Sequence, residues 1–170
     1  MISVKSDCDI IARYLYEKLS RSIDGNDQSY CFIGITTPSQ KIINSLINQN
    51  LVKQENYILM DSYQTFDIEL GSQKNIDGQK KYVLVCDAIS TGYLAQRLDA
   101  ALRVRGACLN YIVVIVDILD RSFSKTKNFL DNFEGNILSL FQYNIKKYTK
   151  NNILDVIFQR NIIRINPHTN

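Results

Sequence analysis

The chain has 170 residues, of which 45% are hydrophobic and 22% are charged, with 7 glycines and 2 prolines. These ordinary globular values predict one domain over residues 1–170, with a full hydrophobic core and little room for disordered linkers. The formal net charge of +3 is too small to indicate a nucleic-acid-binding surface, and no apolar run approaches the ~20 residues of a membrane-spanning helix.

The cysteines and the single histidine argue against a metal centre built from Cys and His ligands. Cys8, Cys31, Cys86 and Cys108 lie far apart without a CxxC pair, so the spacing of metal ligands is absent. His168 lies close to the end of the sequence, where we expect an exposed tail residue. The polar first residues do not resemble a secretory leader, which favours a reducing cytoplasm. No clear stop signal follows His168, so the domain could also be cut from a longer chain.

The first half of the chain predicts alternating helices and strands. Apolar residues at helical spacing mark the helices, and short continuous apolar runs mark buried strands. The predicted elements are helices at 10–19 and 40–51, strands at 30–35 and 57–60, and a polar excursion or mobile loop at 61–81. Ser6 and Asp7 are candidate caps of the first helix.

The second half contains a strand, turn, helix and further strand in that order. These elements lie at 82–86, 94–102 and 111–116, and Gly106 is a natural C-cap of the helix. This is a βαβ unit, so we predict a three-layer α/β fold with a central, mainly parallel sheet flanked by helices. The remaining candidates are a helix at 125–133, a strand at 137–143 and a weaker region at 152–165.

The turn from Cys86 to Leu94 is the best candidate for a functional site. Ligands of open α/β sheets bind beyond the carboxyl ends of the strands, which is where this turn lies. Ser90, Thr91 and Gly92 offer two hydroxyls and a flexible backbone at a helix start, whose free amides attract an anion. Asp87 places a charge where packing alone would not select one. In the simpler alternative, Asp87 and Ser90 only cap the helix.

This turn resembles a known signature. The phosphoribosyl pyrophosphate motif of type I phosphoribosyltransferases has four apolar residues, two acids, two apolar residues and then Thr-Thr-Gly or Asp-Thr-Gly. Residues 83–92 read Val-Leu-Val-Cys-Asp-Ala-Ile-Ser-Thr-Gly. The resemblance covers about residues 30–121, because a long excursion precedes the motif and the next strand leads to Leu119-Asp120-Arg121.

The resemblance implies a function and the residues that carry it. Members of this family bind phosphoribosyl pyrophosphate with Mg²⁺ and transfer the phosphoribosyl group to a nucleobase-like acceptor. By position, Asp87 would hold the ribose hydroxyls and the metal, and Asp87 with Ser90 would be the catalytic pair. The implied ligand-binding residues of the turn are Asp87, Ala88, Ile89, Ser90, Thr91, Gly92, Tyr93 and Leu94.

A second loop is implied to hold the pyrophosphate. It runs from Thr36 to Gln40 and offers Thr36, Thr37 and Ser39, although no basic residue occurs before Lys41. The same stretch is also an ordinary helix start, with Thr37 as the cap and Pro38 at the first helical position. The excursion at 61–81 would act as a lid whose Lys74, Lys80 or Lys81 approaches the pyrophosphate.

The chain departs from the family pattern at the motif itself. Cys86 replaces the first acid with a neutral thiol at its ordinary pKa. Tyr93 and Leu94 replace the usual small residue and the final Thr or Ser. Ser90 stands where purine-type members carry an Asp that acts on the base, so that acid/base role is unfilled.

These departures leave two functions open. One is a transferase; the other is a non-catalytic domain that binds a phosphorylated ribose ligand or a protein partner and acts as a sensing or regulatory module. A homodimer or a partner domain is compatible with both. A Rossmann-type nucleotide site is disfavoured because no GxGxxG follows the first strand.

Overall fold

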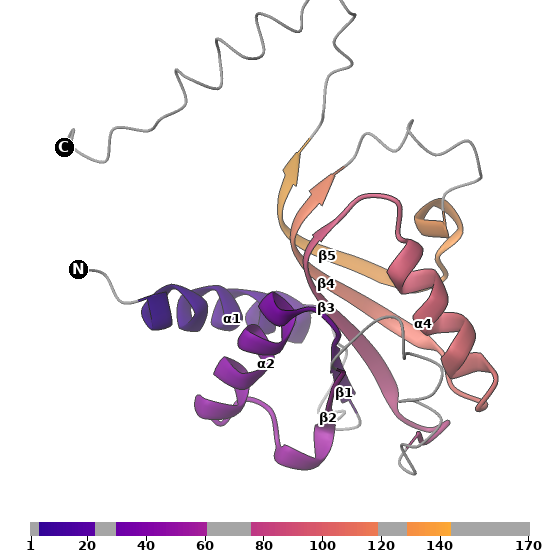
Figure 1. The fold of residues 1–170 in the computed structure, drawn as a ribbon, viewed down its shortest axis with the longest axis horizontal. Coiled ribbons are helices and arrows are strands. Elements are labelled where there is room, and N and C mark those ends of the chain that lie inside the picture. Colours follow the sequence, from indigo (N-terminus) through magenta and orange to yellow (C-terminus); the bar gives the residue numbers. More distant parts are fainter. Residues whose placement is uncertain (1–3, 23–29, 61–75, 119–128, 144–170) are drawn as a thin grey trace, which may run out of the picture.

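The centre of the protein is a parallel β-sheet. In the computed structural model, which describes residues 4–22, 30–60, 76–118 and 129–143, five strands pair in the order β2-β1-β3-β4-β5. All four neighbouring pairs are parallel, which confirms the predicted sheet (Figure 1). The strands are β1 (Tyr30–Gly34), β2 (Tyr57–Leu59), β3 (Lys81–Ile89), β4 (Leu109–Ile118) and β5 (Asn136–Tyr143).

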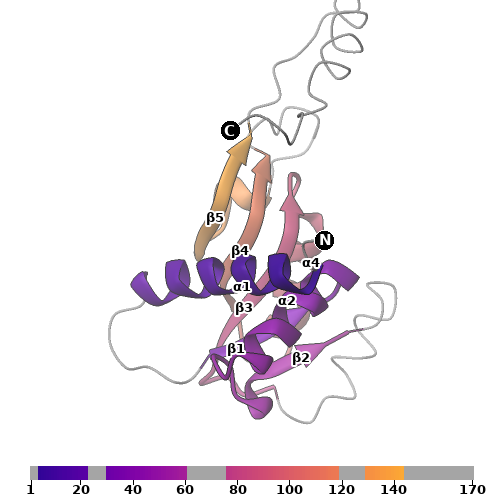
Figure 2. The same ribbon diagram turned by 90° about the vertical axis from the view of Figure 1, so that its left-hand side faces the viewer.

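Helices cover both faces of the sheet, as predicted for a three-layer fold. The helices are α1 (Val4–Arg21), α2 (Thr37–Asn48) and α4 (Tyr93–Arg103), and the short 3-10 turns are η1 (Gln54–Asn56) and η2 (Phe129–Asn132). Figure 1 shows α1 and α2 on one side of the sheet and α4 and η2 on the other. Figure 2 shows α1 lying across β5, β4 and β3.

Two apolar clusters hold the layers together. On one face Leu15 of α1 and Ile43 of α2 pack against Val83 and Val85, and on the other Leu98 of α4 packs with its own set of strand residues. Successive residues of β3 alternate between the clusters because strand side chains alternate between faces. Each fully buried side chain of this size stabilises the fold by roughly 1.5–3 kcal/mol.

The observed boundaries correct several predictions. α1 begins at Val4, so Ser6 and Asp7 lie inside the helix and are not its caps. α2 begins at Thr37, before the predicted residue 40. β3 does not end at Cys86 but continues to Ile89, because the pairing with β4 extends to Ile89↔Asp117.

Other predictions fall partly or wholly outside the described residues. The helix predicted at 125–133 is a 3-10 turn over Phe129–Asn132 where the structure describes it. The predicted excursion from residue 61 to residue 75 and the weaker region at 152–165 lie outside the described part. No helix in the described ranges combines the length and the apolar character that a membrane span requires.

Candidate functional site

The two loops singled out in the sequence flank the point where the chain reverses its direction across the sheet. β1 lies between β2 and β3. The connection from β1 to β2 passes through α2 on one face, and the connection from β3 to β4 passes through α4 on the other. The loops that leave β1 and β3 therefore diverge to opposite faces. In open α/β sheets the crevice outside such a point is where ligands bind.

Asp87 lies at the edge of the sheet where such a crevice is expected. The pairing of β1 with β3 ends at Gly34↔Val85, whereas β3 continues beside β4. Asp87 therefore occupies a part of β3 that extends past the end of β1, and its side chain is only half-buried. A carboxylate in that position can accept hydrogen bonds from a ligand that rests on the carboxyl ends of the strands.

The turn after β3 is shaped by Gly92. This residue has a φ of 69°, and a Cβ built on it would lie 2.5 Å from Cγ of Leu130. The N–H of Tyr93 donates to Oγ1 of Thr91 over 3.4 Å, and the N–H of Gln96 donates to the carbonyl of Gly92 over 2.8 Å, which starts α4. The first turn of α4 thus begins at the crevice, where its free amides favour an anion.

The predicted ligand residues of this turn differ in what they can offer. The side chain of Ile89 is buried and Gly92 has none, so neither residue offers a side chain to a ligand, and Leu94 packs against the core on the α4 side. Ala88 is exposed but carries no polar side-chain group. The side chains with polar atoms are those of Asp87, Ser90, Thr91 and Tyr93, and the ring of Tyr93 is 62% exposed.

The loop after β1 is organised as a helix cap. Oγ1 of Thr36 accepts the N–H of Ser39 over 3.4 Å, and the N–H of Thr36 donates to Oγ of Ser39 over 2.9 Å. Thr36 is therefore the cap, not Thr37 as the alternative had it, and Pro38 is the second helical residue. Ser39 is fully buried and also donates its hydroxyl to the carbonyl of Thr36. Of the three hydroxyl residues of this loop, Thr37 is exposed, Thr36 is half-buried and Ser39 is buried.

Cys86 is withdrawn from the crevice. Its side chain is 6% exposed and belongs to the apolar cluster on the α4 side. Burial raises the pKa of the thiol to about 12, and the neighbouring charge of Asp87 adds to the increase. The expectation of an ordinary pKa was wrong, because the sequence does not show that this position faces the core. Cys86 remains neutral and does not substitute for the missing acid.

The burial of the thiols makes a prediction about their reactivity. Alkylation at pH 8 is expected to modify the half-buried Cys8 and Cys108 first, because thiolate is the reactive form. Cys31 and Cys86, whose burial raises the pKa to about 11 and about 12, should react only as the protein unfolds. Peptide mass spectrometry over time measures the order. Modification of Cys86 as fast as Cys8 would show that its position is open to solvent.

The same pKa values predict how stability changes with pH. Both thiols have a folded pKa above the value of 9.0 for an exposed cysteine, so the unfolded chain loses these protons first. Their contribution is complete below pH 9 and is lost as the pH rises from 9 towards 12. Denaturant unfolding at pH 8 and 10.5 should therefore give a lower midpoint at the higher pH, and a smaller decrease in Cys86→Ser.

Asp117 is a residue of this edge that the sequence analysis missed. It lies near the carboxyl end of β4, in register with Ile89, and is 4% exposed. A signal was present, since Asp117 is the one charge in the apolar run from Leu109 to Ile118. The position of Asp117 within the strand was not predicted, because the strand was expected to end at Val116, whereas β4 ends at Ile118. It is a buried carboxylate one strand away from Asp87.

Comparison with solved structures supports the fold, whereas comparison by sequence finds no related family or protein. No protein-family model matches the chain, and no curated protein matches it. Solved structures do match, and several phosphoribosyltransferases are among them.

A hypoxanthine-guanine-xanthine phosphoribosyltransferase matches with a TM-score of 0.51 and 19% identity, over 82% of this chain and 76% of its own. The adenine phosphoribosyltransferase of Thermoanaerobacter pseudethanolicus matches with a TM-score of 0.52 and 12% identity, over 77% and 79% of the two chains. An HGPRT-ase of Leishmania tarentolae, solved in complex with GMP, matches with a TM-score of 0.51 and 12% identity, over 85% and 81%. At identities this low, the matches show that the fold is shared, and they show no more than the fold.

Proposed function

Because the chain has the fold of the type I phosphoribosyltransferases, we propose that it binds phosphoribosyl pyrophosphate and transfers its phosphoribosyl group to a nucleobase-like acceptor. The observation that carries this proposal is the position of the signature-like segment. Its turn and the loop after β1 leave the same edge of the sheet from neighbouring strands and towards opposite faces, and Asp87 lies on β3 beyond the end of β1.

Each side of the crevice offers donors to one end of the ligand. The amides of the turn at 90–93 and the start of α4 would bind the 5′-phosphate, because a helix N-terminus attracts negative charge. At the start of α2, Thr37 would bind the pyrophosphate through its exposed hydroxyl and its N–H, because the N–H groups of Thr36 and Ser39 are used in the cap and Pro38 has none. Asp87 would accept hydrogen bonds from the ribose hydroxyls and so fix the orientation of C1′.

A Mg²⁺ ion that arrives with the ligand would be held by Asp87 together with the phosphates. In proteins Mg²⁺ usually keeps several waters and is bound by one or two carboxylates together with substrate phosphates, and Asp87 is one such carboxylate. In the described part of the chain no group of three or more His, Cys, Asp or Glu side chains could hold a metal ion. When bound, the ion would neutralise charge on the pyrophosphate as it leaves.

The contribution of the protein to the reaction would be positioning and electrostatics. A nitrogen of the acceptor attacks C1′ as the bond to pyrophosphate breaks, through an oxocarbenium-like state. Asp87 would hold the ribose, Thr37 at the start of α2 would hold the pyrophosphate, and the start of α4 would hold the 5′-phosphate. No side chain of the signature turn provides the acid that purine-type members use, because Ser90 occupies that position.

A second candidate is a non-catalytic domain that binds a phosphorylated ribose ligand. The burial of Cys86 favours it, since one of the two acids of the signature is replaced by a neutral thiol in the core. The exposed ring of Tyr93 at the rim of the turn also departs from the family pattern. Such a domain would bind the ligand through the same turn without transferring it.

Calorimetry and an assay for pyrophosphate release separate the two functions. The protein would be titrated with phosphoribosyl pyrophosphate and Mg²⁺, and separately with ribose 5-phosphate, and then incubated with a panel of bases. Binding with release that depends on one base establishes a transferase. Binding without release establishes the ligand-binding domain. Absence of binding to either compound contradicts both functions.

A further inference from the structure

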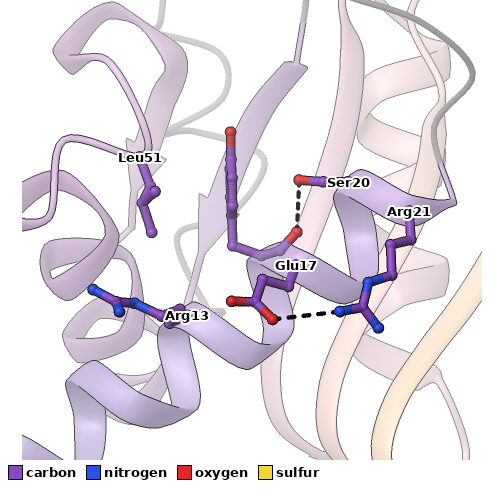
Figure 3. A pocket seen from close by; sticks show the side chains of 6 residues that line it. Arg13, Glu17, Ser20, Arg21 and Leu51 are labelled. Atoms are coloured by element: carbon purple, nitrogen blue, oxygen red, sulfur yellow. Dashed lines mark hydrogen bonds and ion pairs between the residues drawn. The ribbon is translucent and has the colours of Figure 1, made fainter.

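A shallow groove lies between the second half of α1 and the turn that follows α2. Its volume is about 480 Å³, and its lining residues are Arg13, Tyr16, Glu17, Ser20, Arg21 and Leu51. Figure 3 shows Arg13 and Arg21 at opposite ends of the groove, with Glu17 between them and Leu51 on the far wall. The proposed transfer reaction uses none of these residues, so a ligand of the groove is a separate one.

The apolar part of the groove is fixed in position. Tyr16 and Leu51 are half-buried, and both pack against the core cluster beneath α1 and α2. The N–H of Leu51 donates to the carbonyl of Leu46 over 2.9 Å. The N–H of Asn50, which has a φ of 56°, donates to the carbonyl of Ile47 over 2.9 Å. This pattern is a Schellman motif, so the wall that Leu51 forms is held without a ligand.

Arg13, at one end of the groove, is held in place by a neutral partner. Its Nε donates to Oε1 of Gln49 over 3.2 Å, and the amide nitrogen of Gln49 donates to the carbonyl of Asp9 over 3.0 Å. Among the residues that the structure describes, no carboxylate forms an ion pair with Arg13. Because a guanidinium has several further N–H groups, this anchored cation can bind the carboxylate of a ligand.

Arg21, at the other end, is only weakly paired. Its guanidinium lies 3.7 Å from the carboxylate of Glu17, and the two side chains are 81% and 46% exposed. A carboxylate that approaches both terminal nitrogens of the guanidinium forms a stronger contact than this single one. The hydroxyl of Ser20 donates to the carbonyl of Tyr16 over 2.8 Å, so its oxygen can still accept an N–H. The groove thus presents a cation at each end and an acid in the middle.

The distance between the two cations selects the shape of the ligand. Arg13 and Arg21 are eight residues apart on one helix, which corresponds to about 12 Å along its axis. Four residues of an extended peptide span about 13 Å, and every second side chain points to the same side. Two acids four positions apart therefore reach both ends of the groove. The side chain midway between them faces the apolar part, where Glu17 disfavours a third acid.

We propose that this groove binds an extended segment of another protein with the pattern acid-x-apolar-x-acid. The two carboxylates bind Arg13 and Arg21, and the apolar side chain packs between Tyr16 and Leu51. All lining residues except Leu51 belong to α1, so the groove does not enclose a small molecule as ligand pockets do. Recognition of acidic segments by arginine side chains is a recurring mode of peptide binding.

The groove is remote from the candidate site of the transfer reaction. Leu51 follows the C-terminal end of α2, whereas Thr37 begins this helix at the carboxyl edge of the sheet. The 12 residues of α2 separate its two ends by about 18 Å. Peptide binding is therefore independent of the proposed function, and phosphoribosyl pyrophosphate should not compete with it.

Fluorescence polarisation with a labelled peptide tests the groove. The probe is a peptide with blocked ends and the sequence Gly-Ser-Glu-Ser-Leu-Ser-Glu-Ser-Gly. We expect a Kd of about 100 µM, since small contact areas give weak, transient complexes, and affinity should decrease as ionic strength rises. A peptide with Ser in place of Leu, and one with the two Glu residues side by side, should each bind about tenfold more weakly.

Charge reversal assigns the two ends of the groove. Arg13→Glu and Arg21→Glu should each weaken binding of the probe by about tenfold or more. Arg13→Glu should then bind a peptide with the core Lys-Ser-Leu-Ser-Glu more tightly than the original probe, because one end of the groove now carries a carboxylate. Thermal unfolding of each variant shows that the fold is kept.

Arg105→Glu is the matched control. It makes the same change of charge at an exposed position after α4, which lies on the other face of the sheet (Figure 1), and it should leave the affinity unchanged. Absence of saturable binding up to about 2 mM peptide overturns the proposal. So does binding that survives both reversals in the groove, or binding that Arg105→Glu weakens as much as they do.

Discussion

The Asp87→Asn variant is expected to lose binding of phosphoribosyl pyrophosphate while it keeps its fold. The substitution keeps the shape of the side chain but removes its charge, and hydrogen bonds to a charged group are worth about 1.5–3 kcal/mol each. With both ribose hydroxyls affected, affinity should decrease by about a hundredfold or more. Calorimetry at constant Mg²⁺ measures the change, and thermal unfolding should give a midpoint close to that of the wild type, because Asp87 is only half-buried.

Asp99→Asn is the matched control for this substitution. Asp99 is 6% exposed, and its carboxylate accepts the N–H of Leu109 over 2.9 Å and pairs with Arg103 at 2.7 Å. Its replacement should reduce the free energy of unfolding by about 1–3 kcal/mol and leave affinity unchanged. If Asp87→Asn binds the ligand with unchanged affinity, the ligand does not bind at the end of β3. This conclusion holds whether or not the protein is a transferase.

The Gly92→Ala variant is expected to be strongly destabilising, because a methyl group at this position meets both an unfavourable backbone conformation and a neighbouring side chain. The φ of 69° costs a residue with a Cβ roughly 1–2 kcal/mol, and the new methyl group would lie 2.5 Å from Cγ of Leu130, which adds roughly 1–3 kcal/mol of overpacking. A total of about 3 kcal/mol lowers the unfolding midpoint by roughly 6–12 °C for a chain of this size. Calorimetric unfolding measures this decrease in the midpoint.

Gly106→Ala separates the two causes. Gly106 also has a positive φ, 74°, but nothing lies within 4 Å of the position that its Cβ would take. Its replacement should therefore show only the cost of the backbone, roughly 1–2 kcal/mol. Equal destabilisation of the two variants would mean that Leu130 moves away without cost and that the turn is not held by that contact.

The sequence by itself predicted the class of fold. The continuous apolar runs at β1, β3 and β4 indicated strands buried on both faces, which only a parallel sheet covered by helices provides. The order strand, turn, helix, strand after residue 81 indicated the connection through α4. These signals are local, because the period and the hydrophobicity of a segment depend on which faces it buries and not on which strand is its neighbour.

The end of β3 and the two loops depended on tertiary contacts. β3 reaches Ile89 because β4 pairs with it as far as Asp117, and no local feature of residues 86–89 marks that continuation. Thr36 rather than Thr37 caps α2, and the close approach of Ile43 to Gly34 accompanies this start of the helix. A shift of one residue changed which hydroxyl is exposed at the crevice.

The sequence determined which polar side chains are available to the candidate site. The tertiary structure decided which of these side chains lie at the same edge of the sheet. Asp87, the Ser-Thr-Gly turn and the threonines after β1 were visible in the sequence, because their polar groups interrupt apolar patterns. That the two loops leave neighbouring strands at the same edge of the sheet follows from the strand order β2-β1-β3-β4-β5, which is a long-range property. The same holds for Cys86: its identity removes an acid, but only its burial in the core shows that the thiol stays neutral and inaccessible.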